Sequence, residues 1–170
     1  MAKVLISEKH VEQIAQTTAL KLNSLYMDKS EEVVLAPILQ GAVPFFQKVA
    51  HHLEFDPYVD FIGISSYKDK SQGEFNVYKM FDPEMIKGRT VWLFDDLADS
   101  GNTLKFLKGM LLQYGADDVK VCVLLKKEHC TFPIDIVGIE VGNDWVWGFG
   151  MDAPNGRGRT LNAVYVEETT

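Results

Sequence analysis

The chain has 170 residues, and its 17 Lys and Arg against 24 Asp and Glu give a formal net charge of −7. Hydrophobic residues make up 46% and charged residues 24%, which excludes the disordered and disulfide-rich classes and predicts a globular domain with a full core. The negative charge argues against binding nucleic acid through a broad basic surface, which phosphate neutralisation requires.

The sequence also predicts a cytoplasmic protein with no membrane partner. Two cysteines, Cys122 and Cys130, are too few for a disulfide scaffold and suit a reducing compartment. The first residues lack the apolar core of a signal peptide, and no apolar stretch approaches the roughly 18 residues that cross a bilayer. Because no linker or repeat divides the chain, we expect a single domain over residues 1–170.

The first third of the chain predicts a helix, a strand and a second helix. Ser7 can cap a first helix whose apolar face recurs at helical spacing. That face comprises Val11, Ile14, Ala15, Thr18, Leu22 and Leu25. The apolar run 33–39 is typical of a strand covered on both faces. After Gln40 and Gly41, helical spacing resumes at Phe45, Phe46, Val49, Ala50 and Leu53.

The rest of the chain continues this alternation. We expect strands over 58–65, 90–94 and 119–125, and a polar, mobile loop over 66–73. A helix between the last two strands is indicated by Leu104, Leu107, Leu111 and Tyr114, with Gly115 ending it. Strands alternating with helices predict an α/β fold, in which ligands bind at the carboxyl ends of the strands.

The segment 92–104 carries the strongest indication of chemistry. Asp95 and Asp96 follow the expected strand, and a Ser-Gly-Asn-Thr turn then leads into the helix. Free N–H groups and the positive end of a helix dipole attract an anion, so this turn suits a phosphate. The carboxylates need another partner, either ribose hydroxyls or Mg²⁺. Alternatively, they are solvated residues at a strand end, and Ser100 is an ordinary N-cap.

The stretch 94–104 resembles the signature of type I phosphoribosyltransferases, in which two acidic residues precede an Asp-Thr-Gly-x-Thr loop. Further segments resemble the hypoxanthine-guanine branch of this family in order and spacing: 39–41, 59–67, 124–127, 145–152 and 159–162. The resemblance covers about residues 33–166. It implies a mostly parallel twisted sheet flanked by helices, with hood elements near 1–10 and 138–170 over the base site.

The resemblance further implies transfer of the 5-phosphoribosyl group from phosphoribosyl pyrophosphate to N9 of a 6-oxopurine, with Mg²⁺ as cofactor. The phosphoribosyl group would contact Asp95, Asp96, Asp99, Ser100, Gly101, Asn102 and Thr103. Asp99 would be the catalytic residue that exchanges a proton with purine N7. The pyrophosphate would contact Leu39, Gln40, Gly41, Ser66, Tyr67 and Arg159. The purine would contact Lys127, Trp145, Val146 and Asp152, and Mg²⁺ would contact Asp95, Asp96 and Asp152.

Elementary chemistry favours some of these roles and leaves alternatives open. Lys127 can donate to a 6-oxo group, whereas the amino group of adenine would face a second donor at a cost of about 1–3 kcal/mol. The alternative is that Lys127 is a solvated charge. Trp145 can stack on a base, or it can pack in the core beside Trp147. The four histidines show no metal-ligand spacing, so surface roles are expected for His10, His51, His52 and His129.

The sequence departs from the family pattern at three positions, and two other functions stay open. Gln40 and Asn102 replace residues that are often basic in the family, and Ser100 replaces a threonine. A phosphoribosyltransferase for another base is one alternative, and a non-catalytic regulator that senses phosphoribosyl pyrophosphate is the other. A P-loop kinase is excluded because no Gly-x-x-x-x-Gly-Lys string occurs. The resemblance also implies a homo-oligomer, either a dimer or a tetramer.

Overall fold

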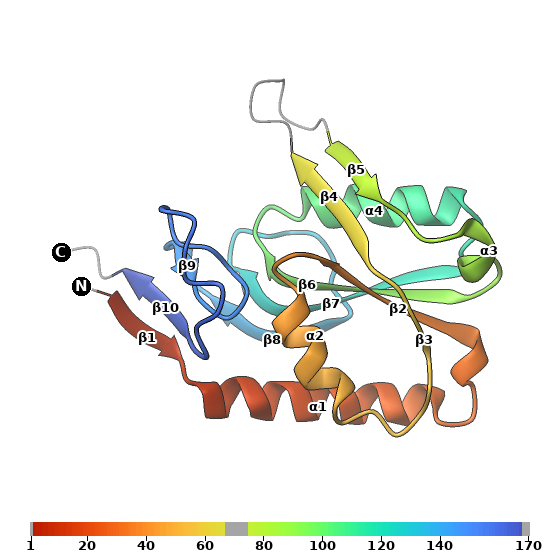
Figure 1. Cartoon of the computed structure of the whole chain (residues 1–170), viewed down its shortest axis with the longest axis horizontal. Coiled ribbons are helices and arrows are strands. Elements are labelled where there is room, and N and C mark those ends of the chain that lie inside the picture. Colours follow the sequence, from red (N-terminus) through yellow and green to blue (C-terminus); the bar gives the residue numbers. More distant parts are fainter. Residues whose placement is uncertain (1, 67–74, 168–170) are drawn as a thin grey trace.

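The computed structural model describes residues 2–66 and 75–167, in which helices and strands alternate (Figure 1). The helices are α1 (Glu8–Tyr26), α2 (Val43–Ala50), α3 (Pro83–Ile86) and α4 (Asn102–Gln113), with a 3₁₀ turn at Ser30–Glu32. The strands are β1 (Ala2–Ile6), β2 (Val33–Leu39), β3 (Tyr58–Val59), β4 (Ile62–Ser66), β5 (Phe75–Lys79), β6 (Thr90–Ala98), β7 (Asp118–Lys127), β8 (Ile136–Val141), β9 (Val146–Trp147) and β10 (Val164–Glu167). No helix in the described ranges has the length and apolar character needed to span a membrane.

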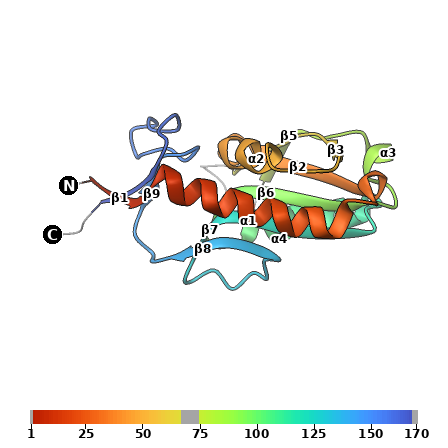
Figure 2. The ribbon, with the colours of Figure 1, turned by 90° about the horizontal axis from the view of Figure 1, so that it is seen from below.

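The main sheet is mostly parallel, as the alternating pattern predicts. Its order is β5-β4-β2-β6-β7-β8, and β3 pairs with the first part of β2. Only β5 runs antiparallel to its neighbour within this sheet. Helix α1 packs against α2 and β8, while α4 packs against β6 and β7 (Figures 1 and 2). The predicted α/β class, with a mostly parallel sheet flanked by helices, is confirmed.

Side chains alternate across β6, the central strand that leads into the predicted site. Trp92 donates its indole N–H to the hydroxyl of Tyr26 in α1, at 2.9 Å. Phe94 packs edge-on against Phe46 of α2, with 5.1 Å between ring centroids. Because side chains two residues apart share a face of a strand, the even-numbered core positions of β6 face α1 and α2. These contacts anchor the strand just before its acidic residues.

Some predicted boundaries are wrong, and strand pairing explains the main ones. Strand β6 continues four residues past the predicted end at Phe94, because its pairing with β7 extends to Ala98 and Lys126. The acidic pair therefore lies within a strand. The strand expected over 58–65 is split into β3 and β4, which pair with different parts of β2. In α1, Leu25 is exposed and the buried face ends on Tyr26 instead.

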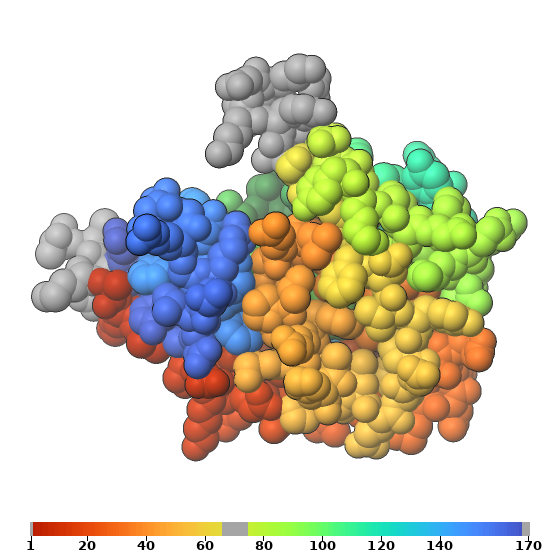
Figure 3. Space-filling model, viewed as in Figure 1, coloured from red at the N-terminus to blue at the C-terminus, as the bar shows by residue number. Residues whose placement is uncertain are grey.

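The chain ends meet in a second, smaller sheet. Its order is β1-β10-β9 and all pairs are antiparallel. Figure 3 shows the segment after β8, in blue, as a lobe that lies against the segment around α2, in orange. Of the residues expected to form a hood, 138–141 lie instead in β8, the edge strand of the main sheet. The expected loop 66–73 falls almost entirely outside the described residues.

Candidate active site

The acidic pair Asp95 and Asp96 lies near the carboxyl end of β6, where ligands bind in sheets of this kind. The Asp95 carboxylate accepts the N–H of Asp96 at 3.0 Å, and the Asp96 carboxylate accepts the N–H of Leu97 at 2.8 Å. Burial raises the pKa of both carboxyl groups, and the neighbouring Asp96 charge raises the pKa of Asp95 further. Within residues 2–66 and 75–167, no Lys, Arg or His forms an ion pair with either carboxylate. Hydroxyl groups or a cation can therefore bind to the carboxylate oxygens.

The arrangement fits Mg²⁺ only when the substrate completes the coordination. Across the part of the chain that the structure describes, no three His, Cys, Asp or Glu side chains are close enough to hold a metal ion. Mg²⁺ typically binds one or two carboxylates and takes its other oxygens from water and substrate phosphates. Asp95 and Asp96 match that pattern. Asp152 does not join them in a cluster of three donors, and it pairs with Arg159 instead.

The turn between β6 and α4 has the geometry of an anion site. Gly101, the N-cap residue of α4, has a φ of 81°, and a Cβ there would lie 2.4 Å from Cβ of Phe132. Both the conformation and the space therefore require glycine. The N–H of Asn102 donates to Oγ of Ser100 at 3.3 Å. In the described residues, the N–H groups of Thr103 and Leu104 have no protein acceptor and can bind an anion.

Three segments that are distant in the sequence converge beside Asp96. A Cβ on Gly41, which follows β2, would lie 1.9 Å from Oδ2 of Asp96. A Cβ on Gly150, in the loop after β9, would lie 2.1 Å from the carbonyl oxygen of Gly41. The positive charge of Arg159 acts on Asp96, lowering the pKa of its carboxyl group against the larger effect of burial. The predicted pyrophosphate loop therefore lies directly against the predicted ribose site.

Arg159 is held in place by the loop that precedes it. Its Nη1 donates to the carbonyl oxygen of Gly150 at 2.7 Å, and its Nη2 lies 3.0 Å from Oδ1 of Asp152. The N–H of Gly150 donates back to the carbonyl of Arg159 at 2.8 Å. The guanidinium keeps further N–H groups for an anion.

The other residues predicted to contact the pyrophosphate lie in the 39–41 loop and at the end of β4. The peptide bond between Leu39 and Gln40 is cis. Ser66 ends β4, where its backbone pairs with Phe75, and Tyr67 lies outside the described residues.

A pocket of about 190 Å³ brings the predicted base-binding residues together. It is lined by Leu97, Asp99, Lys127, Asn143, Asp144, Trp145 and Val146. Lys127 is only 4% exposed and donates through Nζ to the carbonyl oxygen of Asp144. The alternative of a solvated charge is therefore wrong. Burial lowers the pKa of the Lys127 ammonium, while the charges of Asp99 and Asp144 act in the opposite direction.

The two neighbouring tryptophans have different environments. Trp145 is 59% exposed on the rim of the pocket, so the alternative of core packing is wrong for this residue. Trp147 stacks on Tyr165 in the smaller sheet, with 4.9 Å between ring centroids. Asp152 does not line the pocket, and its predicted contact with the purine stays a prediction.

Sequence reasoning missed two residues next to the candidate catalytic group. His129 is exposed, as expected, and its Nε2 lies 2.9 Å from Oδ1 of Asp99. Asn143 lines the base pocket and contacts His129. No spacing in the sequence could indicate these contacts, because the three residues meet only through the pairing of β6, β7 and β8.

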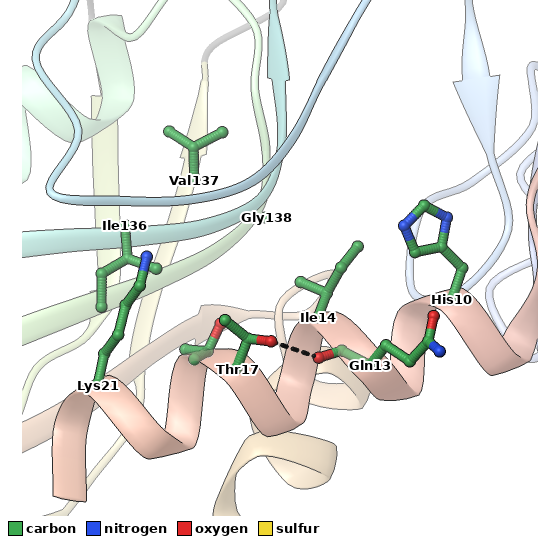
Figure 4. A pocket seen from close by; sticks show the side chains of 9 residues that line it. His10, Gln13, Ile14, Thr17, Lys21, Ile136, Val137 and Gly138 are labelled. Atoms are coloured by element: carbon green, nitrogen blue, oxygen red, sulfur yellow. Dashed lines mark hydrogen bonds between the residues drawn. The ribbon is translucent and has the colours of Figure 1, made fainter. Parts of the chain in front are cut away.

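A second hollow, of about 180 Å³, lies on another part of the molecule, between α1 and β8 (Figure 4). It is lined by His10, Gln13, Ile14, Thr17, Thr18, Lys21, Ile136, Val137 and Gly138. None of the residues predicted for the ribose, pyrophosphate or base site lines it. This hollow is therefore separate from the candidate active site.

An acidic pair, a turn suited to an anion and a pocket with an exposed tryptophan thus meet at the carboxyl end of a mostly parallel sheet. The chain matches the model of the phosphoribosyl transferase domain family over residues 5–154. The hypoxanthine-guanine phosphoribosyltransferase of Streptococcus agalactiae is 33% identical over 172 residues, which cover 98% of this chain and 94% of that protein.

Solved structures agree with this match. A hypoxanthine-guanine phosphoribosyltransferase from Bacillus anthracis aligns with a TM-score of 0.88 and 28% identity, over 98% of each chain. The hypoxanthine phosphoribosyltransferase of Trypanosoma cruzi, solved with its product IMP, aligns with a TM-score of 0.86 and 26% identity, over 96% of this chain and 92% of that one. The chain belongs to the phosphoribosyltransferase family, which confirms the resemblance noted in the sequence.

Proposed function

We propose that the chain transfers the 5-phosphoribosyl group of phosphoribosyl pyrophosphate to N9 of hypoxanthine or guanine, with xanthine as a further candidate. The products are the nucleoside monophosphate and pyrophosphate. The observation that carries the proposal is the buried Lys127 in a pocket with Asp99 and Trp145, next to the acidic pair and the anion-binding turn. Relatives named for hypoxanthine and guanine support the same substrate class.

The sugar and its phosphates are held by charge and by main-chain groups. Asp95 and Asp96 accept hydrogen bonds from the ribose hydroxyls, and the turn from Asp99 to Thr103 binds the 5-phosphate. Arg159 binds the pyrophosphate beside the Leu39-Gln40-Gly41 loop, and Ser66 and Tyr67 are proposed to contact it too. Asp95 and Asp96, together with substrate oxygens, would hold Mg²⁺, which would supply positive charge to stabilise the leaving pyrophosphate. The predicted metal contact of Asp152, which pairs with Arg159, stays a prediction.

The base is selected by side chains of the pocket. One N–H of the Lys127 ammonium is used by the Asp144 carbonyl, and the other two can donate to a 6-oxo group. Trp145 covers the ring, and main-chain groups of Val146 and Asp152 contact its 2-position. As N9 bonds to the sugar, Asp99 accepts the proton of N7, a role that contributes about 10²–10⁴-fold in rate. A cytoplasmic location stays a prediction from the cysteine count and the first residues, and a homo-oligomeric assembly stays a prediction from the resemblance.

The most informative test measures pyrophosphate release with a panel of bases. The purified chain, with phosphoribosyl pyrophosphate and Mg²⁺, is expected to act on hypoxanthine and guanine and to leave adenine, orotate and uracil unused. Preference for one of those three bases would show that Lys127 does not select the substrate. Binding of phosphoribosyl pyrophosphate without release on any base would favour the non-catalytic regulator.

A further inference from the structure

His129 joins the candidate catalytic carboxylate to the amide of Asn143, and all three residues are exposed. Its Nε2 lies 2.9 Å from Oδ1 of Asp99, and its Nδ1 lies 2.5 Å from Oδ1 of Asn143. The backbone N–H of His129 also approaches Oδ1 of Asn143, at 3.4 Å. Because that N–H is a donor, the amide of Asn143 presents its oxygen to His129. The imidazole is therefore held between an amide oxygen and a carboxylate oxygen.

The contact with Asp99 requires a donor on the ring. A carboxylate oxygen only accepts, so the 2.9 Å contact between Nε2 of His129 and Oδ1 of Asp99 is a hydrogen bond when Nε2 carries a proton. A lone pair on Nε2 would instead face a second acceptor, and two acceptors repel each other at that distance. The ring therefore binds Asp99 as a donor.

We propose that His129, fixed by Asn143, is a positioning residue that orients the Asp99 carboxylate for proton transfer with the base. This inference rests on the proposed function, in which Asp99 accepts the N7 proton. The Nε2–H bond occupies Oδ1 and leaves Oδ2 for the base. When the bond between N9 and the sugar forms, the N7–H bond breaks, its electron pair stays on the ring, and the proton moves to Oδ2. Water takes that proton after the product leaves.

The base pocket brings other charged groups close to Asp99. Lys127 of β7 and Asp144 of the loop before β9 line this pocket together with Asp99. Loss of the bond from Nε2 of His129 would therefore release the Asp99 carboxylate from its position beside the base.

A pair of substitutions separates the two ring contacts. The amide nitrogen of Gln can replace Nε2, so His129→Gln keeps a neutral donor to Asp99. The amide nitrogen of Asn can replace only Nδ1, so His129→Asn keeps the contact with Asn143 and loses the one with Asp99. We expect His129→Asn to lower kcat for hypoxanthine by about 10- to 100-fold, because displacing a reacting group lowers the reaction rate by about that factor. We expect His129→Gln to keep a kcat close to that of the wild type, because it keeps the donor to Asp99.

Equal kcat values in the two variants would overturn the inference. A merely structural role would lower the melting temperature of both variants and leave their kcat values equal, so a kcat retained by Gln and lost by Asn is the readout that a structural role would not give. Asp99→Asn, measured in parallel, separates this failure from a failure of the proposed function. If Asp99→Asn lowers kcat and His129→Asn does not, the proposed function stands without His129. If Asp99→Asn keeps the wild-type kcat, neither residue acts in proton transfer.

Discussion

The phosphate end and the base end of the site are built in different ways. The proposed site of the 5-phosphate comes from one continuous segment, the end of β6 and the start of α4, and it offers mainly main-chain N–H groups. The proposed base site is assembled from the ends of β6 and β7 and the loop after β8, and it offers the side chains of Lys127, Asp99 and Trp145. Main-chain recognition depends on backbone conformation, whereas side-chain recognition depends on residue identity and can change with the base.

The convergence of loops on Asp96 gives the largest expected effect. Gly41→Ala places a Cβ where Oδ2 of Asp96 lies, so either the carboxylate or the loop must move. We expect kcat/KM to fall about 100-fold or more, because moving a reacting group by about 1 Å lowers the reaction rate by about that factor. Gly109→Ala is the matched control, because a Cβ there meets no neighbour and alanine favours the middle of a helix. Equal activity in the two variants would contradict the proposed contact.

Lys127 tests whether the base end is selective. Lys127→Met keeps an unbranched buried side chain and removes the donor to the 6-oxo group. Loss of a charge-assisted hydrogen bond of about 1.5–3 kcal/mol predicts a rise of about 10- to 100-fold in the KM for hypoxanthine. The KM for phosphoribosyl pyrophosphate should change little. A similar rise for both substrates would mean that Lys127 supports the fold of the site through its bond to Asp144.

Substitutions of Trp145 and Trp147 should have smaller effects, and each should change a different property of the protein. Trp145 is exposed on the pocket rim, and Trp147 stacks on Tyr165. Stacking on a base contributes about 1–3 kcal/mol, so Trp145→Ala should raise the KM for the base about 10-fold without lowering the melting temperature. Trp147→Ala should lower the melting temperature instead. If Trp145→Ala also destabilised the fold, the exposed ring would have a packing role.

The smallest expected effect concerns stability at the acidic pair. Burial raises the pKa of Asp95 in the folded chain above its ordinary value of 3.8, so ionisation favours the unfolded state. This penalty is absent below the ordinary value and grows as the pH rises from that value to the raised pKa. Asp95→Asn should therefore raise the melting temperature by roughly 2–4 °C at pH 7, as about 1 kcal/mol does in a chain of this size.

The gain from Asp95→Asn should vanish near pH 3 and should be accompanied by lower activity. Thermal melts at several pH values measure the first effect. Asp117, which is exposed, provides the control substitution Asp117→Asn, for which no such gain is expected. A gain of the same size at every pH would show that the charge of Asp95 is not its cause.

The sequence predicts what is local and misses what depends on pairing. Residues 33–39 form β2 with the predicted limits, because an uninterrupted apolar run needs no partner to be recognised. The end of β6 was misplaced because pairing with β7, and not polarity, decides where the strand stops. The strands β3 and β9 have two residues each, too few to show any periodicity.

The same distinction holds for the candidate site. The turn 99–103 could be predicted because glycine, hydroxyl groups and a helix start are adjacent in the sequence. The proximity of Gly41 to Asp96 and of His129 to Asp99 could not, because each pair meets only in the folded sheet. Side chains two residues apart lie on one face of a strand, so the sequence predicts similar environments for Trp145 and Trp147. Only the structure shows that Trp145 is exposed and that Trp147 stacks on Tyr165.

The most direct test of the central claim is a crystal structure of the chain with the nucleoside monophosphate IMP. The account predicts the 5′-phosphate on the main-chain N–H groups of residues 99–103, with the ribose hydroxyls on Asp95 and Asp96. It also predicts the 6-oxo group within hydrogen-bond distance of Nζ of Lys127. A phosphate bound away from this turn, or a base outside the pocket of Lys127 and Trp145, would contradict the account.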